Sequence, residues 1–147
     1  MSVSSGVPRP ALWLGLAGLI PFSGIALLLW LLPSEQRWLS PVLTGYGVVI
    51  LSFMGGCRWG LAAAGMGDGA GLKPLAISVL PALYAWIVAL LPDADAQVLL
   101  ALGLLALLVA DVSLAHQGGA PAWWPALRWP LSLGASGSLL AGAMALA

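Results

Sequence analysis

Two charged side chains, Arg58 and Asp111, lie inside otherwise apolar stretches of this sequence. Counted from the outer start of each stretch, Arg58 lies roughly 24 Å and Asp111 roughly 22 Å along a helix. Charged residues inside a bilayer are costly and commonly mark pathways or binding sites. Their matching depth and opposite charge predict an ion pair, because a guanidinium meets a carboxylate through two parallel hydrogen bonds.

This pair has two interpretations. As a functional site it would form a polar pocket with His116, Arg128 and Lys73 near its rim, which could hold an anionic headgroup, a quinone-like ring or a proton relay. As a structural feature it would be a clamp that fixes helix packing. A single pair without a second intramembrane acid resembles a clamp more than a relay, so we favour the clamp and keep the pocket as the alternative.

The sequence shows no residue pattern typical of redox, metal-binding, phosphate-binding or nucleophilic chemistry. The single cysteine, Cys57, has no partner for an internal disulfide, and no Cys/His cluster predicts a metal site. No phosphate-binding glycine loop and no nucleophile–base arrangement is present. We therefore expect no catalytic residues, no metal and no cofactor. The net charge of zero gives no indication of nucleic-acid binding.

The composition is that of a membrane protein. Hydrophobic residues make up 61% of the 147 residues and charged residues 7%, against about 25% charged in soluble domains. Five continuously apolar stretches approach the 20 or so residues that span a bilayer. We predict an all-α, polytopic membrane helix bundle with five transmembrane helices in a single domain, 1–147. The expected helices are 12–32, 42–64, 75–91, 96–114 and 130–146. The first is too long for a signal-peptide core, so we expect it to be retained.

The distribution of Lys and Arg predicts the orientation. With five spans, Arg9, Lys73, Arg128 and the nearby Arg58 fall on the side of the N-terminus, and Arg37 alone falls on the other. Positive residues mark the cytoplasmic side, which predicts an N-in, C-out topology.

Two segments of the chain resemble each other. Leu-Leu-Pro ends both the first and the third stretch, at 31–33 and 90–92, and each stretch has an interior proline, Pro21 or Pro81. One interpretation is a repeat of two helical hairpins plus one added helix. The other is that Leu-Leu-Pro recurs by chance in a Leu-rich protein.

Small residues predict close helix contacts. Gly56 and Gly60 form a GxxxG motif, and Gly134, Ser138 and Gly142 recur every four residues in the fifth stretch. Small residues at such spacing let helix backbones approach closely. These two faces could meet each other, or the fifth helix could face another chain.

Several strings together carry a family resemblance: 14–22, which opens the first helix; 46–60, which contains Gly55-Gly56-Cys57-Arg58-Trp59-Gly60; Ser78–Pro81; Asp111; and 121–128. The chain resembles, over nearly its whole length, domain-of-unknown-function family 3429, small bacterial membrane proteins related to transmembrane protein 69. The resemblance implies an inner-membrane location and brings no activity with it.

These observations predict a multi-pass protein of a bacterial inner membrane that is not an enzyme. We expect an accessory or assembly partner in a membrane complex, in contact with the lipid bilayer and with another membrane protein or a second copy of itself. The alternative is a small transporter or ligand-binding membrane protein with a cytoplasm-facing polar pocket at Arg58 and Asp111.

Overall fold

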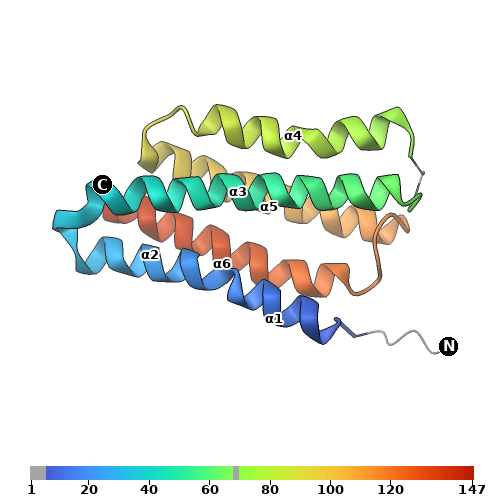
Figure 1. Cartoon of the computed structure of the whole chain (residues 1–147), viewed down its shortest axis with the longest axis horizontal. Coiled ribbons are helices and arrows are strands. Elements are labelled where there is room, and N and C mark those ends of the chain that lie inside the picture. The colour runs from blue at the N-terminus through green and yellow to red at the C-terminus, as the bar shows by residue number, and fades with distance from the viewer. Residues whose placement is uncertain (1–5, 68–69) are drawn as a thin grey trace.

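The computed structural model describes residues 6–67 and 70–147, which form an all-helical bundle (Figure 1). In chain order, its elements are α1 (Arg9–Ala17), α2 (Leu19–Leu31), the short 3-10 helix η1 (Pro33–Glu35), α3 (Gln36–Ala63), α4 (Leu72–Val88), α5 (Asp93–His116) and α6 (Trp124–Ala145). The first two helices run on from each other, so the bundle has five rods, as the five apolar stretches predict.

The first rod is broken at Gly18, where α1 ends and α2 begins. Pro21 has no N–H, and its ring crowds the carbonyl one turn earlier, so the regular hydrogen-bond pattern stops there. The hydroxyl of Tyr46 in α3 donates to the carbonyl oxygen of Gly18 at 2.9 Å. This bond satisfies a backbone group at the break and ties it to α3. The first rod is thus interrupted one turn before Pro21.

Helix α3 runs along the middle of the bundle, with α4 on one side and α2 on the other (Figure 1). It packs mainly on α4, α5 and α2, while α6 packs mainly on α5 and α2. The N-terminus and the connections α3–α4 and α5–α6 lie at one end, which we call the N-terminal end. The connections α2–α3 and α4–α5 and the C-terminus lie at the other, the C-terminal end.

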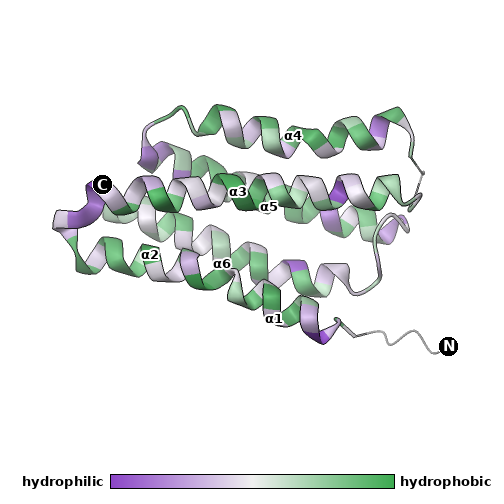
Figure 2. Cartoon of the chain, in the orientation of Figure 1, coloured by the Kyte–Doolittle hydropathy of each residue, from purple (hydrophilic) through white to green (hydrophobic). Residues whose placement is uncertain are grey.

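Apolar side chains fill the centre and also cover the outside. The fully enclosed leucines, each no more than 1% exposed, are Leu29, Leu43, Leu51, Leu100, Leu104 and Leu139. Large apolar side chains such as Trp13 and Leu90 are at least 70% exposed. Hydrophobic residues run along every rod, with polar residues gathered mostly near the ends (Figure 2). This surface suits lipid contact, because an ordinary soluble protein does not expose apolar area of this extent.

By length and composition, three helical stretches can cross a membrane: Arg9–Leu31, Pro33–Ala63 and Asp93–His116. Helix α4, at 17 residues, is a shorter apolar helix. Helix α6 begins at Trp124 rather than at the predicted Pro130, because Pro125 occupies its first turn, where a missing N–H costs no hydrogen bond. This earlier start puts Arg128 inside a helix.

The small-residue faces meet neighbours other than the expected ones. On α6, a Cβ atom added at Gly134 would meet Leu19 of α2, and one added at Gly142 would meet Leu43 of α3 and Gln97 of α5. Ser138 donates to the carbonyl oxygen of Gly134 within α6. On α3, Gly56 and Gly60 are exposed and have open space where a side chain would project. The predicted contact between these two glycines and the α6 face is therefore wrong for the described part of the chain.

The close approach on α3 is made by the neighbouring Gly55. A Cβ atom at this position would lie 2.7 Å from the backbone oxygen of Ser78 and 3.2 Å from Cβ of Pro81, both in α4. Backbone oxygen cannot move aside as a flexible side chain can. Gly55 is thus the residue that lets α3 and α4 pack together.

We predict that Gly55→Ala destabilises the protein by about 1–3 kcal/mol, because the added methyl group overpacks the α3–α4 contact. Gly56→Ala is the matched control and should leave stability unchanged or raise it slightly, since nothing lies within 4 Å of the new methyl group. Thermal unfolding of both variants in the same detergent measures the difference. Equal melting temperatures for the two would contradict the close packing of α3 on α4 at Gly55.

Candidate functional site

The carboxylate of Asp111 in α5 is completely buried and is shared by two arginines. Arg58 of α3 donates from Nη1 to Oδ1 at 2.7 Å, and Arg128 of α6 donates from Nε to Oδ2 at 2.7 Å. Each arginine uses a different carboxylate oxygen, so three helices meet at one acidic side chain. We call Arg58, Asp111 and Arg128 the charge triad.

The burial of the triad makes its pairing necessary. The side chain of Arg128 is 3% exposed and that of Arg58 is 13% exposed. Hydrogen bonds between ionised groups are shorter and about twice as strong as neutral ones, which offsets part of the cost of removing the charges from water. Removing one member of a buried pair leaves a lone charge and typically costs about 3–5 kcal/mol.

The triad carries more positive than negative charge. Its two guanidinium groups face one carboxylate, and the described acidic residues other than Asp111 lie at the C-terminal end of the bundle. Asp68, in the α3–α4 connection, lies outside the described residues. Within the triad itself, one positive charge is left without a carboxylate.

Arg128 still has hydrogen-bonding capacity after it has bound Asp111. Its Nη1 donates to the sulfur of Met54 in α3, a weak acceptor. Its Nη2 is buried without a hydrogen-bond partner among the described residues. A buried donor that lacks a partner costs about 1–3 kcal/mol. This guanidinium can therefore donate a hydrogen bond to a further polar group.

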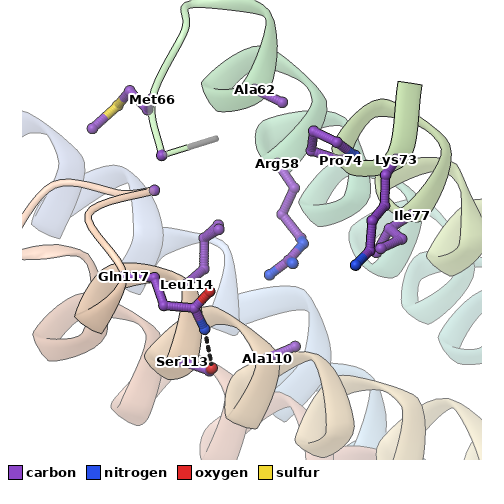
Figure 3. A pocket seen from close by; sticks show the side chains of 12 residues that line it. Arg58, Ala62, Met66, Lys73, Pro74, Ile77, Ala110, Ser113, Leu114 and Gln117 are labelled. Carbon is purple, nitrogen blue, oxygen red and sulfur yellow. Dashed lines mark hydrogen bonds between the residues drawn. The ribbon is translucent and has the colours of Figure 1, made fainter. Parts of the chain in front are cut away.

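Arg58 lines a cavity of about 300 Å³ at the N-terminal end, between α3, α4 and the end of α5 (Figure 3). Lys73, in the first turn of α4, lines the same cavity. On the α5 side, Gln117 donates from Nε2 to Oγ of Ser113 at 2.8 Å. We call this space the Lys73 cavity. It brings two cationic side chains and two neutral polar ones to the polar end of the bundle.

Of the five residues predicted for the pocket, the structure joins Arg58, Asp111 and Arg128 in direct contact and puts Lys73 in the wall of the cavity that Arg58 lines. Arg58 and Asp111 are in direct contact, as their matched depth predicts. Arg128, expected at a rim, is instead a buried member of the triad. His116 lies at the end of α5 and is not among the residues that line the Lys73 cavity.

A second polar cluster, which the sequence analysis did not predict, lies at the C-terminal end. Gln97 of α5 is fully buried, and its Nε2 donates to Oγ of Ser40 at 3.2 Å and to Oγ1 of Thr44 at 3.3 Å. The hydroxyl of Thr44 donates from Oγ1 to Oδ1 of Asp93 at 2.9 Å. Nearby, Trp30 and Gln36 donate to the carbonyl oxygens of Ala141 and Ala145 in α6, each at 2.9 Å. These bonds hold the helices together at the C-terminal end of the bundle.

Comparisons with known proteins identify the family. The sequence model of the family described as "Protein of unknown function (DUF3429)" matches residues 7–144. The chain belongs to this family. No solved structure shows a significant match.

Two relatives carry the name "Transmembrane protein 69". The one from Xenopus tropicalis is 40% identical over 139 residues, which cover 90% of this chain and 53% of the relative. The one from Mus musculus is 37% identical over 128 residues, which cover 82% of this chain and 50% of the relative. The chain thus spans about half the length of these relatives. Together with the apolar helices, the matches show a DUF3429 membrane protein, for which the family supplies no activity.

We predict that Asp111→Asn is strongly destabilising, by about 3–5 kcal/mol, because it leaves two buried guanidinium groups without a carboxylate. Adding Arg128→Met should recover part of that loss, because it removes the more buried of the two unpaired charges. The melting temperatures of the wild type, both single variants and the double variant form the test. If the two single losses simply add in the double variant, Asp111 and Arg128 are not coupled.

Proposed function

We propose that this DUF3429 protein binds an anionic group in the Lys73 cavity, as a ligand-binding or transporting protein of the membrane. The observation that carries the proposal is the surplus of positive charge in the triad, with Arg58 lining a cavity that Lys73 also lines. A cationic cleft with low-dielectric walls concentrates anions, and an arginine can bind a phosphate oxygen or carboxylate through two hydrogen bonds.

The proposed setting is a bacterial inner membrane that all five rods cross, with the N-terminus inside. The Lys73 cavity lies at the end that carries Arg9, Lys73 and the triad, so this orientation opens it toward the cytoplasm. Anionic lipid headgroups of the cytoplasmic leaflet are then the nearest source of a ligand. A phosphodiester headgroup carries one negative charge and fits the chemistry of Arg58 and Lys73.

A second candidate is the role of an accessory or assembly partner in a membrane complex. It is favoured by the exposed face of α3, where Gly56 and Gly60 leave room for another helix to approach closely. The added methyl group of the Gly56→Ala variant would disturb such contact without disturbing the fold. An unchanged mass in detergent, with full rescue of a deletion phenotype, would count against this role.

We predict that Lys73→Gln weakens binding of dioctanoyl phosphatidylglycerol about tenfold, equivalent to about 1.4 kcal/mol, since one of two cationic contacts is lost. Arg37→Gln is the matched control, because Arg37 is an exposed cation in the first turn of α3, at the end of that helix away from Arg58 and the Lys73 cavity. Titration of the purified protein in a non-ionic detergent, followed by native mass spectrometry, compares the two variants. Equal affinities for Lys73→Gln and Arg37→Gln would rule out the Lys73 cavity as the binding site.

We predict that alkaline phosphatase fused after Ala147 is active, because five crossings from a cytoplasmic N-terminus place the C-terminus in the periplasm. A fluorescent protein that matures only in the cytoplasm, fused at the same position, is the control and should stay dark. An inactive phosphatase with a bright fluorescent fusion would mean that the orientation or the number of crossings is wrong.

A further inference from the structure

A second cavity, of about 400 Å³, lies on the other side of the charge triad, bounded by α1, α2, α3 and α6 and by Leu104 of α5. Its walls are mostly apolar, with Phe22, Phe53 and Leu131 among them. Its volume is within the range of about 300–1,000 Å³ that is usual for sites of small ligands. We call it the Ser132 cavity. The residues that line it are distinct from those of the Lys73 cavity.

Three side chains on one face of α6 line this cavity, and each has a polar atom without a partner among the described residues. Trp124, Arg128 and Ser132 follow one another at intervals of four residues, so they lie one above the other on the helix. The unpartnered atoms are Nε1 of Trp124, Nη2 of Arg128 and Oγ of Ser132. Arg128 is 3% exposed and Ser132 is 1% exposed. Buried polar groups in proteins are nearly always hydrogen-bonded, so three together on one wall call for an occupant.

The chemistry of these atoms defines the head of the occupant. The indole N–H and the guanidinium N–H groups can only donate, and the serine hydroxyl can donate as well. The complementary head is therefore a hydrogen-bond acceptor. A carboxylate fits best, because it offers acceptor sites on two oxygens. It also carries a negative charge, which would balance the second arginine of the triad.

The position of the cavity defines the rest of the occupant. It lies beside the break between α1 and α2 at Gly18, a residue that is itself in its wall. Four aromatic residues, Phe22, Phe53, Trp123 and Trp124, contribute to the lining, and most of the other lining residues are aliphatic. An apolar chain that enters from the lipid would meet no charged group except Arg128 among the lining residues.

We propose that the Ser132 cavity binds a long-chain fatty acid, with its carboxylate on Arg128, Ser132 and Trp124 and its chain in the apolar part of the cavity. This site goes beyond the proposed headgroup binding at Lys73, because it uses the opposite side of the triad and a ligand that arrives through the membrane.

The test uses the full-length protein in phosphatidylcholine vesicles at alkaline pH, with 9,10-dibromostearic acid as the probe. Bromine quenches tryptophan fluorescence on contact, and Trp123 and Trp124 line the cavity. We expect a quenching component that saturates at low mole fraction and is displaced by oleic acid. The methyl ester of the same acid, which has no charge, should need an about tenfold higher mole fraction. Quenching without a saturable component, or equal saturation by acid and ester, would overturn the proposal.

The Ser132→Ala variant gives a signature that a purely structural serine does not. Without ligand it should melt at the same or a higher temperature than the wild type, since the lost hydroxyl has no partner among the described residues. It should nevertheless need a several-fold higher mole fraction of the acid. Ser136→Ala is the matched control one turn along α6: its hydroxyl donates to the carbonyl oxygen of Ala101 at 3.1 Å, so it should lower the melting temperature and leave acid binding unchanged. Identical acid binding by Ser132→Ala and the wild type would also overturn the proposal.

Lys73→Gln separates this site from the headgroup site. It should retain binding of dibromostearic acid even though it binds phosphatidylglycerol more weakly, because Lys73 does not line the Ser132 cavity. Loss of acid binding in Lys73→Gln would assign both ligands to the Lys73 cavity and remove the support for a second site.

Discussion

The carboxylate of Asp111 holds three helices of this bundle in register. Its two oxygens each bind one arginine, and the arginines come from α3 and α6, which both pack on α5. In a bilayer, apolar packing between helices has no water to escape from, so specific polar contacts and close backbone approach decide which helices meet. The charge triad supplies the polar contact near the N-terminal end, and Gln97 with Ser40 and Thr44 supplies one near the C-terminal end. Between these two clusters the contacts are mainly leucine and glycine packing.

Depth and charge allow the Arg58–Asp111 contact to be predicted from the sequence, because both residues interrupt stretches of nearly equal length. The same reasoning puts Arg128 at a rim, because the fifth apolar stretch starts only after it. A signal for the earlier helix start is nevertheless present in the sequence: Pro125 after two tryptophans is typical of the first turn of a helix at a membrane interface. That signal puts Arg128 one turn inside α6 and gives two arginines for one aspartate.

The glycines of α3 show that the spacing of small residues alone does not predict which face of a helix packs against its neighbour. The GxxxG motif at Gly56 and Gly60 predicts a close contact, but the residue that makes one is Gly55, rotated by about 100° around the same helix. In a helix that is apolar on every side, hydropathy does not say which face is inside. In α3 the face is decided by Arg58 and by Tyr46, whose polar atoms need partners on α5 and at Gly18. The sequence predicts a polar pocket at Arg58 with Lys73 near its rim as an alternative, but it does not predict the Ser132 cavity, since that cavity depends on how the helices are rotated and on the break between α1 and α2.

The triad also connects the two sides of the molecule. Arg58 lines the Lys73 cavity and Arg128 lines the Ser132 cavity, yet both arginines depend on one carboxylate. An anion that draws one arginine away from Asp111 leaves more of the carboxylate's charge to the other arginine, which then binds an anion of its own less strongly. Coupling of this kind is reciprocal, so each ligand would weaken the binding of the other by the same factor. A clamp that holds three helices together can therefore also couple the two cavities that we propose as binding sites. The structural role of the triad and the proposed ligand-binding roles do not exclude each other, because the same carboxylate holds both arginines.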